Sequence, residues 1–111
     1  MRSTMTAVLE RSATVRDELT TEPYELPWAS EARFFVQTLE LAGTGASLEF
    51  STQISPDGLH WCDLDETRHR VDSVGLTSWL VSGFGQWLRV RCHVAGSDPT
   101  AKLRIYLVGK D

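Results

Sequence analysis

Strict alternation of apolar and polar residues constrains this chain more than any other feature of its sequence. In residues 47–54, SLEFSTQI, Leu48 and Phe50 belong to an apolar set at every second position, and polar side chains fill the positions between. The same period of two recurs in residues 86–94, QWLRVRCHV, and in residues 101–108, AKLRIYLV. Successive side chains of a strand point to opposite faces, so each segment is predicted to be a half-buried β-strand.

Two further segments complete the predicted sheet. Residues 33–43 begin with RFFV, which is apolar on both faces and typical of a central strand, and residues 75–83 form a shorter strand between two glycines. The sequences between the strands, GTG, PDG, GFG and GSDP, all favour turns. Short strands with regular turns predict an all-β fold, a single antiparallel β-sandwich of jelly-roll-like form.

The first part of the chain is less regular. Residues 5–19 fit a helical template nearly as well as an alternating one, so helix and strand both remain open there. We expect an extended N-terminal arm with edge strands over residues 1–31, followed by the β-sandwich domain over residues 32–111. Two prolines flank residues 24–26, which favours a short edge segment at that point.

Composition and charge narrow the function classes. The chain has 111 residues, of which 41% are hydrophobic and 23% charged, as expected for one folded domain. No apolar run approaches the roughly 18 residues of a membrane span, and no secretory signal is evident near the start. We therefore expect a cytoplasmic protein as made, which could leave the cell as part of a virion.

The net charge of −4 is distributed unevenly. Residues 1–31 carry three arginines and six acids, whereas residues 86–111 carry five bases and two acids. These complementary ends predict contact between copies of the chain in a homo-oligomer, with solvated surface charge as the alternative. A negative overall charge and few outward bases argue against nucleic acid as the partner.

The segment SPDG, residues 55–58, predicts a tight hairpin. Proline presets the first turn position, aspartate suits the second, and Gly58 can take the left-handed conformation of a three-residue loop. In that register Gln53 pairs with Trp61, so Trp61 would point outward and Cys62 into the core. A one-residue bulge would reverse both directions.

The outward positions of the predicted strands gather aromatic and arginine side chains. Such side chains anchor protein interfaces because they combine a large rigid contact area with a polar group. Two alternatives remain open: cross-strand pairs that only stabilise an exposed sheet face, and a site on which sugars stack. The predicted interface or ligand face consists of Trp61, Trp87, Arg89, Arg91, Arg104 and Tyr106.

No arrangement typical of an enzyme or a metal site is present in the sequence. The acidic residues between positions 57 and 72 lack EF-hand spacing, and the three histidines fall on different predicted elements. Neither a Gly-x-Ser-x-Gly turn nor a phosphate-binding glycine loop occurs. Cys62 and Cys92 are both expected on the core side as buried thiols, with their bonding state open. We expect no catalytic residue, no metal and no cofactor.

Two resemblances bear on function. The order SPDGLHW, then WLRVR about thirty residues later, then LRIYLVG, resembles the last half of discoidin-type (coagulation factor 5/8 C-terminal) domains over residues 47–109. That resemblance implies a jelly-roll-like sandwich that binds sugars or lipid head groups, but the family's binding loops match nothing here, so no binding residue is carried over. In outline, a small β-sandwich with an N-terminal arm is also similar to phage capsid decoration proteins and other phage structural components.

These observations together predict a non-enzymatic structural or assembly protein. We expect it to oligomerise and to dock on a larger particle such as a phage capsid, using the acidic arm and the Trp/Arg/Tyr face for protein contacts. The alternative is a carbohydrate-binding module of discoidin-like form. Neither the partner nor the number of copies follows from the sequence.

Overall fold

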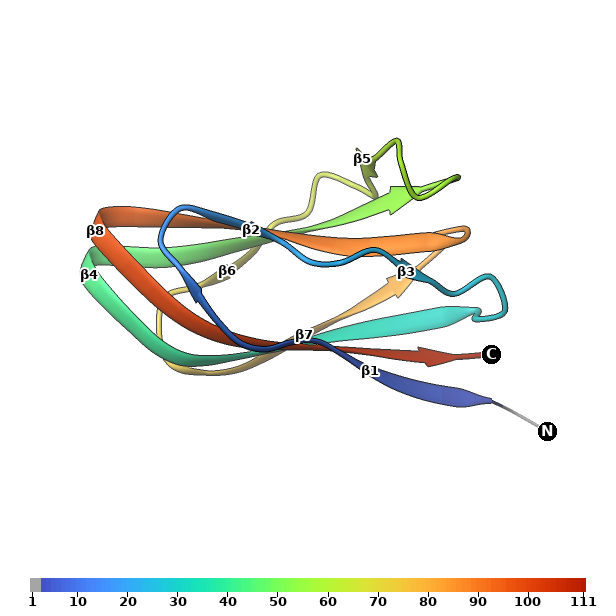
Figure 1. The fold of residues 1–111 in the computed structure, drawn as a ribbon, viewed down its shortest axis with the longest axis horizontal. Helices are drawn as coiled ribbons and strands as arrows, with labels where there is room; N and C mark the ends of the chain where they lie inside the picture. The colour runs from blue at the N-terminus through green and yellow to red at the C-terminus, as the bar shows by residue number, and fades with distance from the viewer. Residues whose placement is uncertain (1–2) are drawn as a thin grey trace.

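The computed structural model describes residues 3–111, which form an all-β fold without helices (Figure 1). All strand pairings in this part of the chain are antiparallel. The all-β prediction is therefore confirmed. The strands are β1 (Thr4–Val15), β2 (Glu18–Thr20), β3 (Tyr24–Glu25), β4 (Glu31–Ser55), β5 (Cys62–Asp63), β6 (His69–Val71), β7 (Gly75–Ser82) and β8 (Trp87–Lys110).

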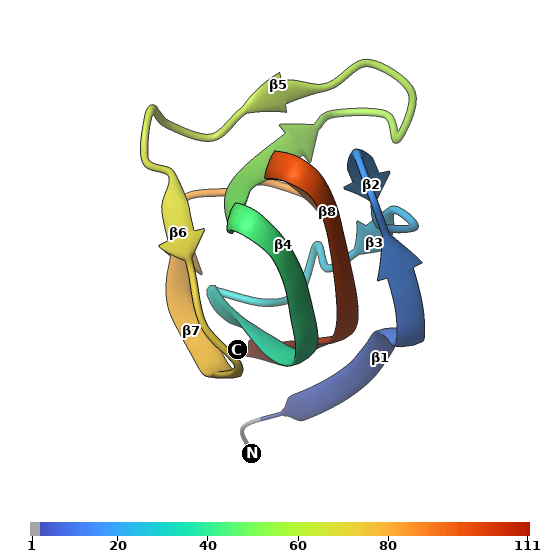
Figure 2. The same cartoon turned by 90° about the vertical axis from the view of Figure 1, so that its left-hand side faces the viewer.

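One long ribbon of two strands organises the molecule. β4 and β8 pair from Glu31 opposite Lys110 to Ser55 opposite Trp87, with register shifts between Thr38 and Ser47. Figures 1 and 2 show both strands arching over together at one end of the molecule. A single ribbon folded in this way supplies the central strands of both layers of a β-sandwich, which agrees with the predicted jelly-roll-like form.

Glycine permits the sharp turn of the ribbon at this corner. Gly43 has φ of +114° and Gly96 has φ of +129°, a region that residues with a Cβ rarely adopt. A Cβ atom on Gly96 would lie 2.9 Å from the Cα atom of Ala46, and one on Gly43 would lie 2.8 Å from the Cα atom of Pro99. The two strands therefore approach each other at the corner more closely than side chains would allow.

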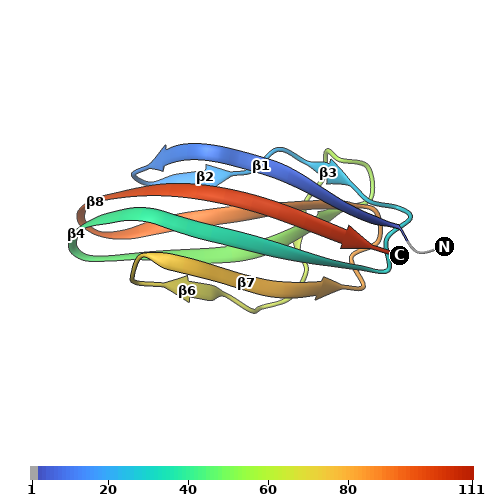
Figure 3. The ribbon, with the colours of Figure 1, turned by 90° about the horizontal axis from the view of Figure 1, so that it is seen from below.

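Short strands extend the folded ribbon on both sides. The β1–β7 layer consists of β1, residues 101–110 of β8, residues 31–42 of β4, and β7, side by side in that order (Figure 3). The β2–β6 layer consists of residues 87–94 of β8 and residues 47–55 of β4, flanked by β2 and β3 on one side and by β5 and β6 on the other.

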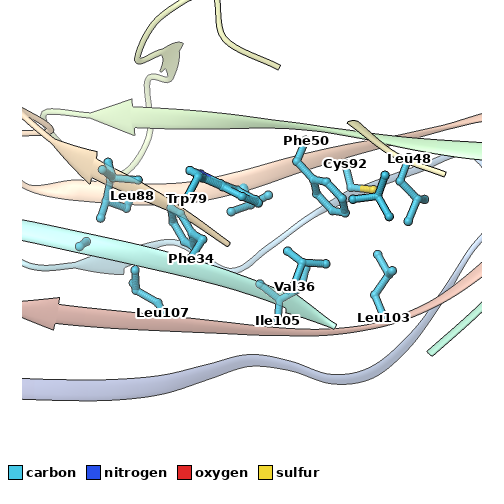
Figure 4. Close-up of a cluster of buried hydrophobic side chains, with 14 of the residues drawn as sticks. Phe34, Val36, Leu48, Phe50, Trp79, Leu88, Cys92, Leu103, Ile105 and Leu107 are labelled. Atoms are coloured by element: carbon cyan, nitrogen blue, oxygen red, sulfur yellow. The ribbon is translucent and has the colours of Figure 1, made fainter. Parts of the chain in front are cut away.

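The core fills the space between the layers, and an aromatic cluster joins them (Figure 4). The Trp79 ring lies 5.7 Å from the Phe34 ring of its own layer and 5.7 Å from the Phe50 ring of the opposite layer. Its indole N–H donates a 2.8 Å hydrogen bond to the Thr52 hydroxyl. The alternating positions predicted to be internal on β4 and β8 are mostly confirmed, although Cys62 is exposed. The largest fully buried side chains include Phe34, Val36, Leu48, Phe50, Leu88, Val90, Leu103, Ile105 and Leu107.

The N-terminal segment takes the extended form. β1 lies at the edge of the β1–β7 layer, and β2 and β3 are short strands at the edge of the other layer. The helical alternative over residues 5–19 is therefore wrong, and the short edge segment at residues 24–26 is confirmed. Val15 and Leu26 are buried in the core, so this segment is part of the sandwich and its deletion would expose apolar surface.

The predicted hairpin register at residues 55–58 is wrong by two positions. Gly58 has the expected left-handed φ of +79°, but pairing resumes only where Ile54 meets Cys62 and Gln53 meets Asp63. The loop is longer because the Asp57 carboxylate accepts hydrogen bonds from the backbone N–H groups of both Leu59 and His60, at 2.8 and 2.9 Å. These bonds replace the strand pairing of a three-residue turn.

Candidate functional site

The predicted interface residues lie on two opposite outer surfaces of the sandwich. Residues 88, 90, 92 and 94 point inward in one layer, whereas residues 101, 103, 105 and 107 point inward in the other. The side chains of β8 that point into the core are therefore at even positions before the corner at residues 95–100 and at odd positions after it. Trp61, Trp87, Arg89 and Arg91 belong to the β2–β6 layer, and Arg104 and Tyr106 belong to the β1–β7 layer.

On the β2–β6 layer, Arg89 is held in a compact cluster. Its guanidinium carbon lies 4.3 Å from the centre of the Trp61 ring, a cation–π contact. Its Nε donates a 2.7 Å hydrogen bond to the Gln53 side chain, whose amide donates a 3.0 Å bond to Asp63. Partial burial lowers the pKa of Arg89, and the charge of Arg91 lowers it further. These contacts hold Trp61 against Arg89, whereas strand pairing places Asp63, and not Trp61 as predicted, opposite Gln53.

Trp87 lies at the end of the same layer, against the 55–61 loop. A Cβ atom on Gly58 would be 3.2 Å from the Trp87 ring, so the glycine allows the loop to pack closely against the indole. Asp57 holds the loop in place, and the backbone N–H and side chain of His60, followed by the Leu59 N–H, keep the Asp57 pKa well below its usual range. The 55–61 loop is therefore a fixed structural support for Trp87.

A shallow polar groove of about 200 Å³ lies next to the Arg89 cluster. Ion pairs join Arg91 to Glu18 and Arg68 to Asp63, the latter at 2.8 Å. The groove floor includes Ser51, which is 8% exposed. Sequence reasoning missed Ser51 because an outward serine on a strand is usually solvated.

The outer surface of the β1–β7 layer has a different chemical character. Leu80 is 55% exposed and Leu76 67% exposed, and Val8 is also exposed. Strand pairing places Tyr106 between Val8 and Phe35. We call this surface the Phe35 face; its apolar residues are Val8, Phe35, Leu76, Leu80, Tyr106 and Val108.

Of the Phe35 face, sequence reasoning identified only Tyr106. A usable signal was present: Phe35 and Val108 are apolar residues at positions of their strands where alternation requires polar ones. An apolar start such as that of residues 33–43 predicts a central strand with both faces covered. Phe34 is buried, but Phe35 is only half-buried, so that expectation is wrong for the outer side.

The two cysteines occupy different environments. Cys92 is buried and Cys62 is exposed, and both are free thiols. The expectation that Cys62 lies in the core is wrong, because Cys62 pairs with Ile54 near the open end of the sandwich, beyond the packed interior. A groove of about 530 Å³ at this end includes Cys62 and Phe84.

This difference predicts different thiol reactivity. Burial, followed by the charge of Glu18, raises the pKa of Cys92 to about 12, so its reactive thiolate is scarce at pH 8. In the native protein we expect a thiol reagent to modify Cys62 alone, and to modify both cysteines after denaturation. Counting released chromophore per chain measures this, and rapid modification of both cysteines in the native protein would contradict the structure.

The raised pKa of Cys92 also makes the stability of the fold depend on pH. Since the pKa is higher in the folded state, the contribution of Cys92 to stability is present below pH 9 and lost as pH rises toward 12.

The structure also bears on metal binding and on membrane spanning. Across residues 3–111, no group of three or more His, Cys, Asp or Glu side chains is placed to hold a metal ion. His69 instead stacks on Trp79, with 4.4 Å between ring centres, and burial lowers the pKa of His69. Within the same residues, the structure has no helix of the length and apolar character needed to cross a bilayer.

Comparisons with known proteins show a shared fold. No protein-family model matches the sequence, and no curated protein matches it. The resemblance to discoidin-type domains therefore stays an expectation. Among solved structures, the SPBc2 prophage-derived protein YomS matches 100% of this chain and 96% of its own, with a TM-score of 0.62 and 11% identity.

Two larger proteins match over nearly the whole of this chain. The PBSX exported protein XepA covers 95% of it with a TM-score of 0.68 and 14% identity. The VP2 subviral particle of infectious bursal disease virus covers 99% of it with a TM-score of 0.59 and 10% identity. This chain spans 36% of XepA and 32% of VP2, so it corresponds to about a third of each. At these identities the likeness shows a common β-sandwich fold.

Proposed function

We propose that this protein is a non-enzymatic structural component of a virus particle, such as a phage virion, in which copies associate through the Phe35 face. The observation that carries the proposal is the apolar outer surface of the β1–β7 layer. Leu76 and Leu80 are both more than half exposed, although they lie on a regular strand whose outer positions are normally polar. Large apolar side chains exposed together on one sheet face mark a protein interaction site.

A second copy of the chain is the partner that this surface fits best. Beside Phe35 and Leu80, a hollow of about 450 Å³ is lined by an acid, Glu31, and by two bases, Arg33 and Lys110. A surface with both charge signs beside apolar side chains can be complementary to itself, as a two-fold symmetric interface requires. On this face Arg33 lies between Leu80 and Val108, so charged and apolar groups are both available for contact with a second copy.

The fold comparisons support the particle context. YomS is described as prophage-derived, XepA as an exported protein of PBSX, and the VP2 match comes from a subviral particle. These descriptions belong to those proteins, and they favour a virion component over other roles available to a β-sandwich. We infer that the protein is made in the cytoplasm and incorporated from there into the particle, on which it docks as a decoration or another small component.

Replacing Leu80 by aspartate tests the self-association. We expect the wild-type protein to sediment as a defined oligomer and the Leu80→Asp variant to sediment as a monomer, because a buried unpaired carboxylate would weaken association by at least about tenfold. Sedimentation velocity over a range of concentrations measures the change.

A matched control separates the face from a general effect of charge. Leu59 is 78% exposed and lies in the 55–61 loop, outside the Phe35 face, so Leu59→Asp should leave the oligomer intact. A wild-type protein that is monomeric at every concentration, or an oligomer that survives Leu80→Asp, would overturn the proposal.

A further inference from the structure

We propose that the free edge of β7 pairs with β7 of a second copy, so that the β1–β7 layers of two copies join into one continuous sheet. This contact is made by backbone groups at the side of the sandwich, whereas the Phe35 face is an outer surface of the layer. The inference therefore goes beyond association through the Phe35 face, and one copy can make both contacts at once.

β7 ends its layer with an edge that has no neighbouring strand. Among residues 3–111 it pairs with β4 alone, over its whole length and without a register shift. Figures 2 and 3 show it as the last strand on one side of its layer. The backbone N–H and C=O groups of β7 that point away from β4 are therefore available to another strand.

The other edges of the sandwich have features that oppose such pairing. β1 is interrupted by two register shifts, and it carries the charged residues Glu10 and Arg11 between them. β2, β3, β5 and β6 are each only two or three residues long. Bulges, charged side chains and short edge strands are the means by which natural sheets prevent edge-to-edge contact.

β7 has none of these protective features. Its eight residues, GLTSWLVS, include no proline and no charged residue, and the longer segment of residues 73–88 is uncharged throughout. Leu76 and Leu80 add two apolar side chains that are more than half exposed. A long, regular and apolar edge of this kind favours the addition of another strand.

A second copy fits this edge because β7 is complementary to itself. In an antiparallel pair related by a two-fold axis, residues opposite each other point to the same face of the sheet. An axis through Ser78 places Leu76 of each copy opposite Leu80 of the other. The exposed leucines are then paired across the contact, which an axis through either neighbouring residue does not achieve. No charged residue of β7 meets its own copy in this arrangement.

Disulfide cross-linking tests both the pair and its register. The parent variant is Cys62→Ser, which removes the exposed native thiol, while Cys92 stays buried. We expect Ser78→Cys in this parent to form a covalently linked dimer on mild oxidation, because the axis brings the two sulfur atoms within bonding reach. Arg33 donates a 3.1 Å hydrogen bond to the Ser78 hydroxyl, so its charge would favour the reactive thiolate of the introduced cysteine.

Ser82→Cys in the same parent is the matched control. Ser82 is exposed on the same strand, but in this register the Ser82 residues of the two copies lie about 26 Å apart, given the rise of a strand. Linked dimer should therefore be at least about tenfold less abundant than for Ser78→Cys. Equal yields from the two variants, or no linked dimer from Ser78→Cys, would overturn the inference.

Hydrogen exchange of the wild-type protein tests the contact without a substitution and separates it from the Phe35 face. As the protein concentration rises, amides of β7 should exchange at least about tenfold more slowly, because strand pairing protects them. Protection of the Phe35 and Tyr106 side chains with unchanged exchange in β7 would overturn the edge pairing and leave the proposed function standing. Slower exchange in β7 while Phe35 and Tyr106 stay accessible would support the edge pairing and contradict association through the Phe35 face.

Discussion

Replacing Gly96 by alanine is expected to destabilise the fold by about 3 kcal/mol or more. Gly96 has φ of +129°, and a Cβ atom there would lie 2.9 Å from the Cα atom of Ala46 and 3.1 Å from the Thr44 carbonyl oxygen. Both contacts are with backbone, so the β4–β8 ribbon would have to open at its corner. The free energy of unfolding, measured by chemical denaturation, reports the loss.

Gly45 provides the control at the same corner. Its φ is +67°, but nothing lies within 4 Å of a Cβ atom added there. Gly45→Ala should therefore destabilise by only about 1 kcal/mol, the ordinary penalty for alanine in the left-handed region. Equal losses for the two variants would show that close approach of the strands does not shape the corner.

Removing the Phe34 ring is expected to have an equally large effect. Phe34→Ala should lower the free energy of unfolding by about 3–5 kcal/mol, because Phe34 is fully buried and its ring packs on Trp79 in the cluster that joins the layers. This loss is a large fraction of the stability expected for a domain of this size. Denaturant titration of dilute protein measures it.

The adjacent residue gives a sharp contrast. Phe35 points to the outer surface of the same strand, so Phe35→Ala should change the stability of the monomer by less than about 1 kcal/mol while weakening self-association. A large loss of monomer stability for Phe35→Ala, or a small one for Phe34→Ala, would contradict the placement of these two rings.

The alternation of residues predicted much of the fold. Leu48, Phe50, Leu88 and Ile105 all lie where a period of two places them, because burial between two layers acts on every second side chain. β1 was harder to predict, since residues at the edge of a sheet are half-buried and alternate less clearly between apolar and polar. Its register shifts at Val8, Glu10 and Ala13 blur the period further.

The candidate site was predictable only in part. Local pattern indicates which residues of a strand share a face, but it does not show which layer that face belongs to. The ribbon bends at Gly96–Pro99 and the inward phase of β8 changes there, so Arg91 and Arg104 end on opposite surfaces. The hairpin register was also hard to predict, because it depends on the Asp57 side chain. Its carboxylate accepts hydrogen bonds from backbone N–H groups that would pair with the opposite strand in a three-residue turn.

The molecule therefore has two chemically distinct outer surfaces on one folded ribbon. The Phe35 face is apolar and contains both charge signs near its centre, whereas the surface with Trp61 is polar and internally paired. We assign self-association to the Phe35 face, and the core separates it from the surface with Trp61.

Hydroxyl-radical footprinting at increasing protein concentration tests this account most directly, because it reports the solvent exposure of individual side chains. As copies associate, we expect oxidation of Phe35, Leu80 and Tyr106 to decrease together, while oxidation of Trp61 and Trp87 stays constant. Concentration-dependent protection of Trp61, or the absence of any protection on the Phe35 face, would contradict it.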